Sequence, residues 1–286
     1  ALRANGRSAN TIGSYRSDVS VLAAWLADAG QVDPPVDAIT PELLATFVAS
    51  DTVQRRRDGT AKAPGSVNKV RASLRAFFRW LVDTGALPAS PARSLKLKPS
   101  EPVAPDILTP AEQKLLLSTV RARKGAAAAR DLLMFELLLG TGIRLSSLVA
   151  LDVEDLRLDD KRMIINAKGG RREAVFLKTN LRRQLAAHVR RLARAGEDAG
   201  AVFRSSRGAR ISTRQVQTRL RYWLDEAGIG KSISPHSLRH TFGSRLYART
   251  RDLRLDQKAL GHRHVTTTQI YVQLADDALE DAIEAM

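Results

Sequence analysis

The stretch Ser234-Pro-His-Ser-Leu-Arg-His240 determines how the rest of this chain is interpreted. Pro235 is suited to open a helix, because the first helical position needs no backbone N–H donor. His236 and Arg239 then lie three residues apart, on one face of that helix. Four of the five histidines of the chain lie in or shortly after this stretch, followed by one tyrosine: His236, His240, His262, His264 and Tyr271. A cationic cluster beside a tyrosine suits a phosphodiester better than other common substrates.

The composition favours a protein that binds DNA. The 286 residues are enough for one large domain or two ordinary ones, and the 44% hydrophobic content is typical of a globular chain. A net charge of +16 predicts a polyanionic partner, first nucleic acid and second an anionic membrane surface. Without a bilayer-length apolar run or a signal-peptide pattern, we expect no membrane contact and a cytoplasmic, nucleoid-associated location. The absence of cysteine excludes disulfides, thiol catalysis and cysteine–zinc sites.

The first hundred residues have the pattern of a helical domain. Apolar residues recur at helical spacing from Ile12 to Leu26, and Thr40-Pro41 provides a cap and a first-position proline for a second helix. A third amphipathic helix is expected from Ser66 onward, and a short fourth one over 87–95. The run from Lys96 to Ile107 holds three prolines and little apolar content, which is typical of an extended linker. We therefore expect a helical N-terminal domain over 1–98, a linker over 99–106 and a second domain over 107–286.

The second domain is expected to combine helices with a small antiparallel sheet. The segment 126–139 is apolar nearly all round, as in a buried helix, and ends at Gly140-Thr-Gly142 just before Arg144. Two short strand-like runs, 163–165 and 174–177, are separated by the basic turn 168–172, which predicts a hairpin. Further helices are expected over 181–195, 213–227 and 236–249. The predicted fold class is mainly α, with an α+β second domain.

The residues near the predicted turns and helix starts match the needs of phosphoryl transfer. That chemistry needs a nucleophile, cations that neutralise the phosphate oxygens and an acid for the leaving oxygen. Arginine suits the second role, because its planar fork meets two phosphate oxygens and keeps its charge. The candidates are Tyr271 as nucleophile, Arg144 and Arg239 as phosphate cations, Lys168 as acid for the 5′ oxygen, His236 as base and His262 as phosphate donor.

These residues carry a resemblance to the tyrosine recombinase (phage-integrase) family, of the simple Xer-like or Cre-like two-domain type. Gly140-Thr-Gly-Ile-Arg144 resembles the family's first arginine box, and Lys168 its hairpin lysine. The stretch 236–240 is similar to the second box, Leu260-Gly-His262 to the third, and Tyr271 to the nucleophile. The first domain resembles the family's core-binding, SAM-like module in length and pattern only.

The resemblance implies strand exchange between two DNA duplexes. Tyrosine attack would leave a 3′-phosphotyrosyl bond and a free 5′ hydroxyl, and no cofactor and no metal would be needed. The family works as a homo-tetramer on paired double-stranded DNA sites and passes through a Holliday junction. The acidic, amphipathic segment 276–286 is similar to the family's exchanged C-terminal helix. With about a hundred residues before the catalytic domain, a simple Xer, resolvase-like or transposon type is favoured over an integrase with an added arm-binding module.

One position departs from the family pattern. Many members have an acidic residue three positions after the first arginine, where it helps to orient the histidine of the second box, and this chain has Ser147. A serine can still form a hydrogen bond but adds no charge. The general-base role of His236 is therefore the assignment that this departure affects most.

Each candidate residue could also have a purely structural role, and two other functions are compatible with the sequence. In isolation, Arg144 could cap a helix, Lys168 could be a solvated turn residue, and Tyr271 could belong to a core. A type IB topoisomerase, which relaxes DNA alone, and a DNA-binding protein without catalysis are the alternatives to a recombinase. For DNA contacts, we expect residues on the third helix and on the helix that begins at Thr213: Asn68, Lys69, Arg71, Arg75, Arg214, Gln217 and Arg221.

Overall fold

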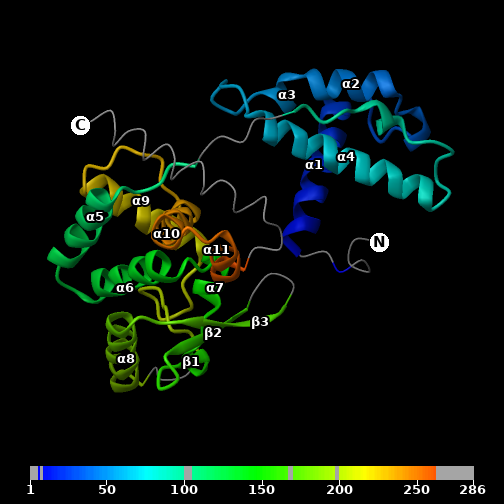
Figure 1. Cartoon of the computed structure of the whole chain (residues 1–286). Coiled ribbons are helices and arrows are strands. Elements are labelled where there is room, and N and C mark those ends of the chain that lie inside the picture. Colours follow the sequence, from blue (N-terminus) through cyan, green and yellow to red (C-terminus); the bar gives the residue numbers. More distant parts are fainter. Residues whose placement is uncertain (1–5, 7–8, 100–104, 167–169, 197–199, 262–286) are drawn as a thin grey trace. The chain divides into compact units, whose positions relative to one another are not determined.

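The computed structural model covers the chain, and its described residues are 6, 9–99, 105–166, 170–196 and 200–261. The chain divides into two compact units, Ala1–Pro102 and Val103–Met286 (Figure 1). Each unit has its own hydrophobic core.

Unit 1 is helical in its described part. Its elements are α1 (Ala9–Asp28), the 3₁₀ turn η1 (Val36–Ala38), α2 (Pro41–Ala49), α3 (Asp51–Gln54), α4 (Pro64–Asp83) and the 3₁₀ turn η2 (Pro91–Ser94). Thr40 caps α2 by accepting a hydrogen bond from the Leu43 N–H at 3.2 Å, and Pro41 follows it. The core side chains come from facing helices and include Leu22, Phe47, Leu74 and Phe78. The helix expected over 87–95 is only the short turn η2, because prolines at 88 and 91 interrupt it.

Unit 2 consists of helices around a small sheet. Its elements are α5 (Pro110–Ala122), α6 (Ala126–Thr141), α7 (Leu145–Ala150), the 3₁₀ turn η3 (Val153–Asp155), β1 (Leu156–Arg157), β2 (Arg162–Asn166), β3 (Arg172–Phe176), α8 (Thr179–Arg194), α9 (Thr213–Glu226), α10 (Pro235–Thr250) and α11 (Leu253–Leu260). The sheet has the order β1-β2-β3 and is antiparallel throughout, with Met163 opposite Val175. The predicted hairpin is therefore present, and the predicted mainly α fold class is confirmed.

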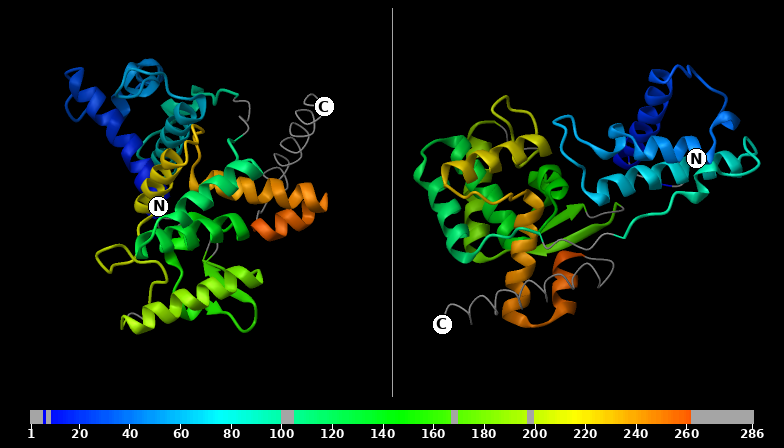
Figure 2. Two further views of the ribbon diagram at one scale, coloured as in Figure 1. Left: turned by 90° about the vertical axis from the view of Figure 1, so that its left-hand side faces the viewer. Right: turned by 90° about the horizontal axis from the view of Figure 1, so that it is seen from above.

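Helix α6 is the centre of unit 2. Its side chains are buried on several sides, among them Leu133, Met134, Phe135 and Leu138, as expected for a helix that is apolar nearly all round. α5, α8, α9 and α10 pack against it. α10 and α11 lie side by side and form the part of the unit that is coloured orange in Figure 2. The end of α6, the start of α10 and the end of α11 are therefore held within one packed body. The first leads directly to Arg144, and the second carries His236 and Arg239.

Candidate active site and DNA-binding face

The start of α10 is fixed by a capping box. The Ser234 hydroxyl accepts a hydrogen bond from the Ser237 N–H at 3.2 Å, and the Ser237 hydroxyl accepts one from the Ser234 N–H at 3.1 Å. Pro235 occupies the first helical position, as predicted. This cap sets the rotation of the first turn, so that His236 is exposed while Arg239 points into unit 2 and is buried.

Arg239 connects the ends of two other helices. Only 3% of its surface is exposed. Its Nη1 donates to the carbonyl of Gly142 at 2.5 Å, and its Nη2 donates to the carbonyl of Leu260. These carbonyls lie at the C-terminal ends of α6 and α11, where the helix dipoles favour a positive charge. The guanidinium is therefore stabilised where it is buried, and it fixes three segments to one another.

Arg144 approaches the same place from the start of α7. Its backbone caps α7, and its Nη2 donates to the carbonyl of Gly261 at 3.3 Å. The turn between α6 and α7 depends on Gly142, which has a φ of +63°. A Cβ at this position would overlap the ring of Phe242 and come within 2.8 Å of Leu260 Cδ2. Arg144 and Arg239 thus converge on Leu260 and Gly261, immediately before His262.

The two described histidines of the site are held largely neutral. Partial burial, together with the charges of Arg239 and Arg144, lowers the pKa of His236. Burial, then the neighbouring His236 and Arg239, lowers the pKa of His240 to about 4. The two rings stand nearly perpendicular, with centroids 4.5 Å apart. A neutral, exposed imidazole can accept a proton, so His236 has the protonation state that a general base needs.

Ser147 bonds to the hairpin. It is 3% exposed, and its hydroxyl donates to the carbonyl of Asn166 at 2.8 Å. Asn166 is the last residue of β2, two positions before Lys168. In many family members the acidic residue at this position helps to orient a histidine. In this chain, the Ser147 hydroxyl instead bonds to the end of β2, the strand that leads to the hairpin turn.

Three of the six candidate catalytic residues, Lys168, His262 and Tyr271, lie outside the described residues. The segment 276–286 does too. Within the described ranges, no group of three or more histidine, aspartate or glutamate side chains is arranged to hold a metal ion. In the same part of the chain, no helix combines the length and apolar character needed to span a membrane.

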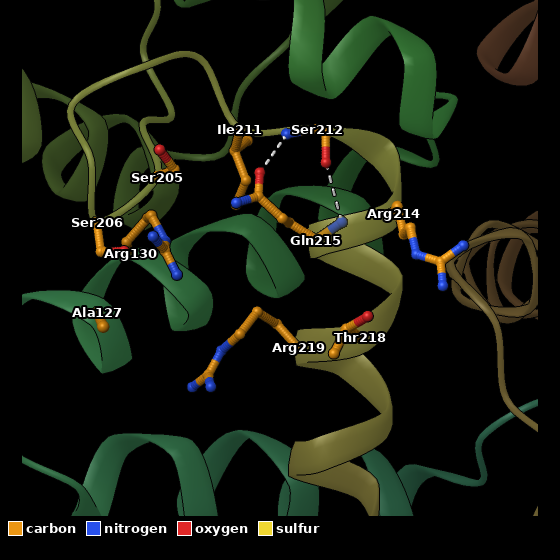
Figure 3. Close-up of a pocket in the computed structure, with 10 residues that line it drawn as sticks. All are labelled: Ala127, Arg130, Ser205, Ser206, Ile211, Ser212, Arg214, Gln215, Thr218 and Arg219. Carbon is orange, nitrogen blue, oxygen red and sulfur yellow. Dashed lines mark hydrogen bonds between the residues drawn. The ribbon is translucent and has the colours of Figure 1, made fainter.

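The exposed face of α9 carries the candidate DNA contacts of unit 2. Arg214, Gln217 and Arg221 are all exposed, at the i, i+3 and i+7 positions of one helix face. Beside the start of α9 is a pocket of about 420 Å³, which Arg130, Ser206 and Thr218 help to line. Figure 3 shows Arg214 on the outer side of this helix, pointing away from Arg130.

A buried carboxylate that the sequence analysis did not single out bonds to two arginines that line this pocket. Asp131 is fully buried and accepts hydrogen bonds from Arg130 Nη2 at 2.7 Å, Arg219 Nε at 2.6 Å and Trp223 Nε1 at 2.9 Å. The Arg219 guanidinium also lies over the ring of Tyr222, 4.7 Å from its centroid. This network fixes α9 against α6. The adjacent Arg-Asp pair inside a mostly apolar helix is the sequence signal that could have revealed it.

On α4, the four candidate DNA contacts separate into two pairs. Lys69 and Arg75 are exposed. Arg71 is buried, and Asn68 forms hydrogen bonds to the backbone of Lys98 and to Arg71 itself. Lys69 and Arg75 therefore extend from the exposed surface of α4, while Asn68 and Arg71 bond to each other and, through Asn68, to the chain at Lys98.

Comparisons with known proteins identify the family to which both units are similar. Residues 106–278 match the phage integrase family, and residues 2–85 match the phage integrase N-terminal SAM-like domain. "Tyrosine recombinase XerC" of Neisseria meningitidis serogroup B (strain ATCC BAA-335 / MC58) is 30% identical over 275 residues, which cover 95% of this chain and 87% of that protein. "Tyrosine recombinase XerD" of Lacticaseibacillus casei is 30% identical over 278 residues, covering 96% and 91%.

Solved structures share the fold. XerH recombinase bound to a palindromic difH substrate matches with a TM-score of 0.74 and 21% identity, covering 95% of this chain and 78% of that one. XerA recombinase matches with a TM-score of 0.56 and 23% identity, covering 99% and 94%. With the two arginines converging on the turn before His262 and the family match extending over most of unit 2, the chain belongs to the phage integrase family and is a tyrosine recombinase.

Proposed function

We propose that this protein is a site-specific recombinase that exchanges DNA strands through a 3′-phosphotyrosyl intermediate on Tyr271. The observation that carries the proposal is the convergence of Arg144 and Arg239 on Leu260 and Gly261. Two guanidiniums from distant parts of the chain meet there in a partly buried place, where a phosphate would be neutralised more strongly than in water. His262 follows this turn directly in the sequence.

In the first step, the Tyr271 oxygen attacks the scissile phosphorus. His236 takes the phenolic proton, and the bond from phosphorus to the 5′ oxygen breaks. Lys168 gives a proton to the leaving 5′ oxygen, while Arg144, Arg239 and His262 bind the non-bridging oxygens. The products are a phosphotyrosyl bond at the 3′ end and a free 5′ hydroxyl.

In the second step, the 5′ hydroxyl of the partner duplex attacks the phosphotyrosyl phosphorus. Lys168 takes its proton back from that hydroxyl, and the protonated His236 returns a proton to the tyrosine. One phosphodiester is replaced by another, so the reaction needs no ATP. The side chains named above supply the charge neutralisation and proton transfer, so we propose no cofactor.

We further propose that the units divide the work of binding. Residues 1–98 act as the core-binding domain, 99–106 as the linker and 107–286 as the catalytic domain, with Lys69, Arg75, Arg214, Gln217 and Arg221 contacting the duplex. Four copies assemble on two sites through the segment 276–286 and pass through a Holliday junction. A lambda integrase tetramer bound to a Holliday junction, which shares the fold at a TM-score of 0.69, supports this assembly. Such a protein works on DNA in the cytoplasm.

A nicked suicide duplex that carries the cognate site tests the proposal. The nick lets the short 5′-hydroxyl fragment diffuse away, so the phosphotyrosyl adduct accumulates and is visible on a denaturing gel. We expect an adduct with the wild type and none with Tyr271→Phe. Strand exchange between two labelled duplexes then distinguishes a recombinase from a topoisomerase. Tight binding without any adduct would contradict the proposed chemistry.

A further inference from the structure

Arg71 of α4 is a buried cation with little to neutralise it. Only 8% of its surface is exposed. Its Nη1 donates a hydrogen bond to the Asn68 side-chain oxygen at 3.2 Å. Among the described residues, Arg71 forms no ion pair. Buried arginines are normally paired with a carboxylate, because an isolated buried charge is costly. Among the described residues of unit 1, no carboxylate forms an ion pair with Arg71, so its charge is available to an anionic ligand.

Arg71 lines a pocket of about 400 Å³ between α2, α3, α4 and the chain after η2. We call this the Arg71 pocket. Its polar lining residues are Arg71, Gln54, Ser94, Lys96 and Lys98, and its apolar ones are Ala45, Val48, Ala49 and Leu95. The lining thus contains three cations and, in this described part of unit 1, no carboxylate. Such a cavity fits a small anion.

The pocket is held in shape by two side-chain amides. Asn68 Nδ2 donates to the carbonyl of Lys98 at 2.7 Å, and Asn68 Oδ1 accepts from the N–H of Lys98 at 2.9 Å. The same oxygen accepts the bond from Arg71, so one amide fixes both the extended chain and the guanidinium. On another wall, Gln54 Nε2 donates to the carbonyl of Val48 at 2.5 Å. The Arg71 guanidinium and the backbone that carries Lys98 are therefore positioned before any ligand arrives, which reduces the entropy lost on binding.

We propose that the Arg71 pocket binds one backbone phosphate of the DNA on which the recombinase acts. This inference rests on the proposed function and deepens it. The planar fork of Arg71 can meet two phosphate oxygens, and the ammonium groups of Lys96 and Lys98 add point charges. Asn68 is then a positioning residue, not a base contact. Phosphate contacts fix the register of a protein on DNA without reading its sequence.

The main experiment measures DNA binding by the full chain as a function of salt, with Arg71→Leu compared to wild type. One lost phosphate contact lowers the slope of log K against log salt by about 0.9. The affinity deficit of the variant therefore shrinks about threefold between about 50 and 200 mM salt. The preference for the cognate over a scrambled duplex stays within about twofold of wild type, because no base contact is lost. A changed preference with an unchanged salt slope would show base contact instead and overturn the proposal.

The stability of the same variant separates binding from folding. Without DNA, Arg71→Leu is expected to melt at the same temperature as wild type or higher, because an apolar side chain replaces an uncompensated buried cation. A purely structural arginine would give the opposite result, a lower melting temperature with an unchanged salt slope. Arg55→Leu is the matched control, because Arg55 is exposed and pairs with Asp51 at 3.1 Å outside the pocket. An equal loss of slope in this control would overturn the proposal.

Two further arms identify the ligand. If Arg71 and Lys98 hold the same phosphate, the double variant Arg71→Leu/Lys98→Ala loses less affinity than the sum of the single losses on a logarithmic scale. Inorganic phosphate at constant ionic strength tests for a free-anion site. Stabilisation of wild type but not Arg71→Leu by phosphate, with equal DNA binding by both, would assign the pocket to a free anion and overturn the DNA proposal. Adduct formation by wild type is scored separately, so failure of the pocket and failure of the proposed chemistry are distinguishable.

Discussion

Two buried arginines, one in each unit, show how differently a helix can hold a cation. Arg239 is 3% exposed and donates to carbonyls at the ends of two other helices, so other parts of its own unit hold its charge in place. Arg71 is 8% exposed, and among the described residues its guanidinium donates one hydrogen bond, to the neutral side-chain amide of Asn68. Burial alone therefore does not reveal what an arginine does. The number and kind of its partners distinguish a guanidinium that joins the ends of two helices from one whose charge is matched only by a neutral amide among the described residues.

Substitution of Arg239 tests the first half of this comparison and should have the largest effect. Arg239→Met leaves the carbonyls of Gly142 and Leu260 without this donor and removes a phosphate cation. We expect a stability loss of about 3 kcal/mol and a fall in cleavage of about 10²–10³-fold. Arg144→Met is the control, because Arg144 is partly exposed and the variant loses only one hydrogen bond, the one of 3.3 Å to the Gly261 carbonyl. It should reduce cleavage similarly while changing the urea midpoint little, and equal destabilisation by both variants would contradict the comparison.

Asp131 provides a third arrangement, in which a carboxylate neutralises the arginines. Asp131→Asn keeps the shape but leaves Arg130 and Arg219 without their shared counter-charge. Removal of one partner from a buried ion pair costs about 3–5 kcal/mol, and we expect a value near the lower end because the amide oxygen still accepts a bond. Urea unfolding measures it. The matched control is Asp160→Asn, whose exposed pair with Arg162 at 3.1 Å should contribute less than about 1 kcal/mol.

The sequence predicted what depends on local periodicity and missed what depends on distant partners. The extent of α6, the β2–β3 hairpin and the start of α10 at Pro235 follow from patterns within a few residues, and the structure contains all three. The partners of Arg239, by contrast, lie 97 and 21 residues away, and no local pattern specifies them.

The candidate DNA contacts on α4 show the same limit. Helical spacing places Asn68 and Arg71 three residues apart on α4, where their side chains bond to each other. It could not show that the extended chain at Lys98 bonds to that face, because this chain lies 30 residues further on. Arg71 is consequently buried, whereas the neighbouring Lys69 is exposed.

Asp256 extends the comparison from buried cations to a buried acidic side chain. It is fully buried on α11, and within the described residues neither of its carboxylate oxygens has a hydrogen-bond partner. Burial, then the charge of Asp252, raises its pKa to about 6. The folded state therefore holds a proton that the unfolded state releases near pH 4, so this group makes stability fall as pH rises from about 4 to about 6.

Asp256→Asn should remove this pH dependence. At pH 7.5 the variant is expected to exceed wild type by about 2 kcal/mol, and at pH 4 the two should be nearly equal, because the aspartate is then protonated and resembles the amide. Urea unfolding at both pH values measures the difference. Asp252→Asn is not a suitable control, since Asp252 caps α11. The exposed Asp160→Asn is suitable and should show no such dependence. A constant difference between wild type and Asp256→Asn at both pH values would mean that the carboxylate is not held protonated.

Ser147 offers the smallest and most specific test, because its neutral hydroxyl bonds to a carbonyl where the family often has an acid. Ser147→Ala removes one hydrogen bond to Asn166 and should lower stability by about 1 kcal/mol. If the bond serves to aim the hairpin at the leaving oxygen through Lys168, cleavage should slow by about fivefold, which corresponds to the same energy. A substrate with sulfur in place of the 5′ bridging oxygen has a leaving group that needs no proton, so it should restore the rate of Ser147→Ala. If Ser147→Ala still cleaves the sulfur substrate more slowly than wild type, the effect lies at His236 or at the arginines. Ser147 would then have the orienting role that the acidic residue has in other family members.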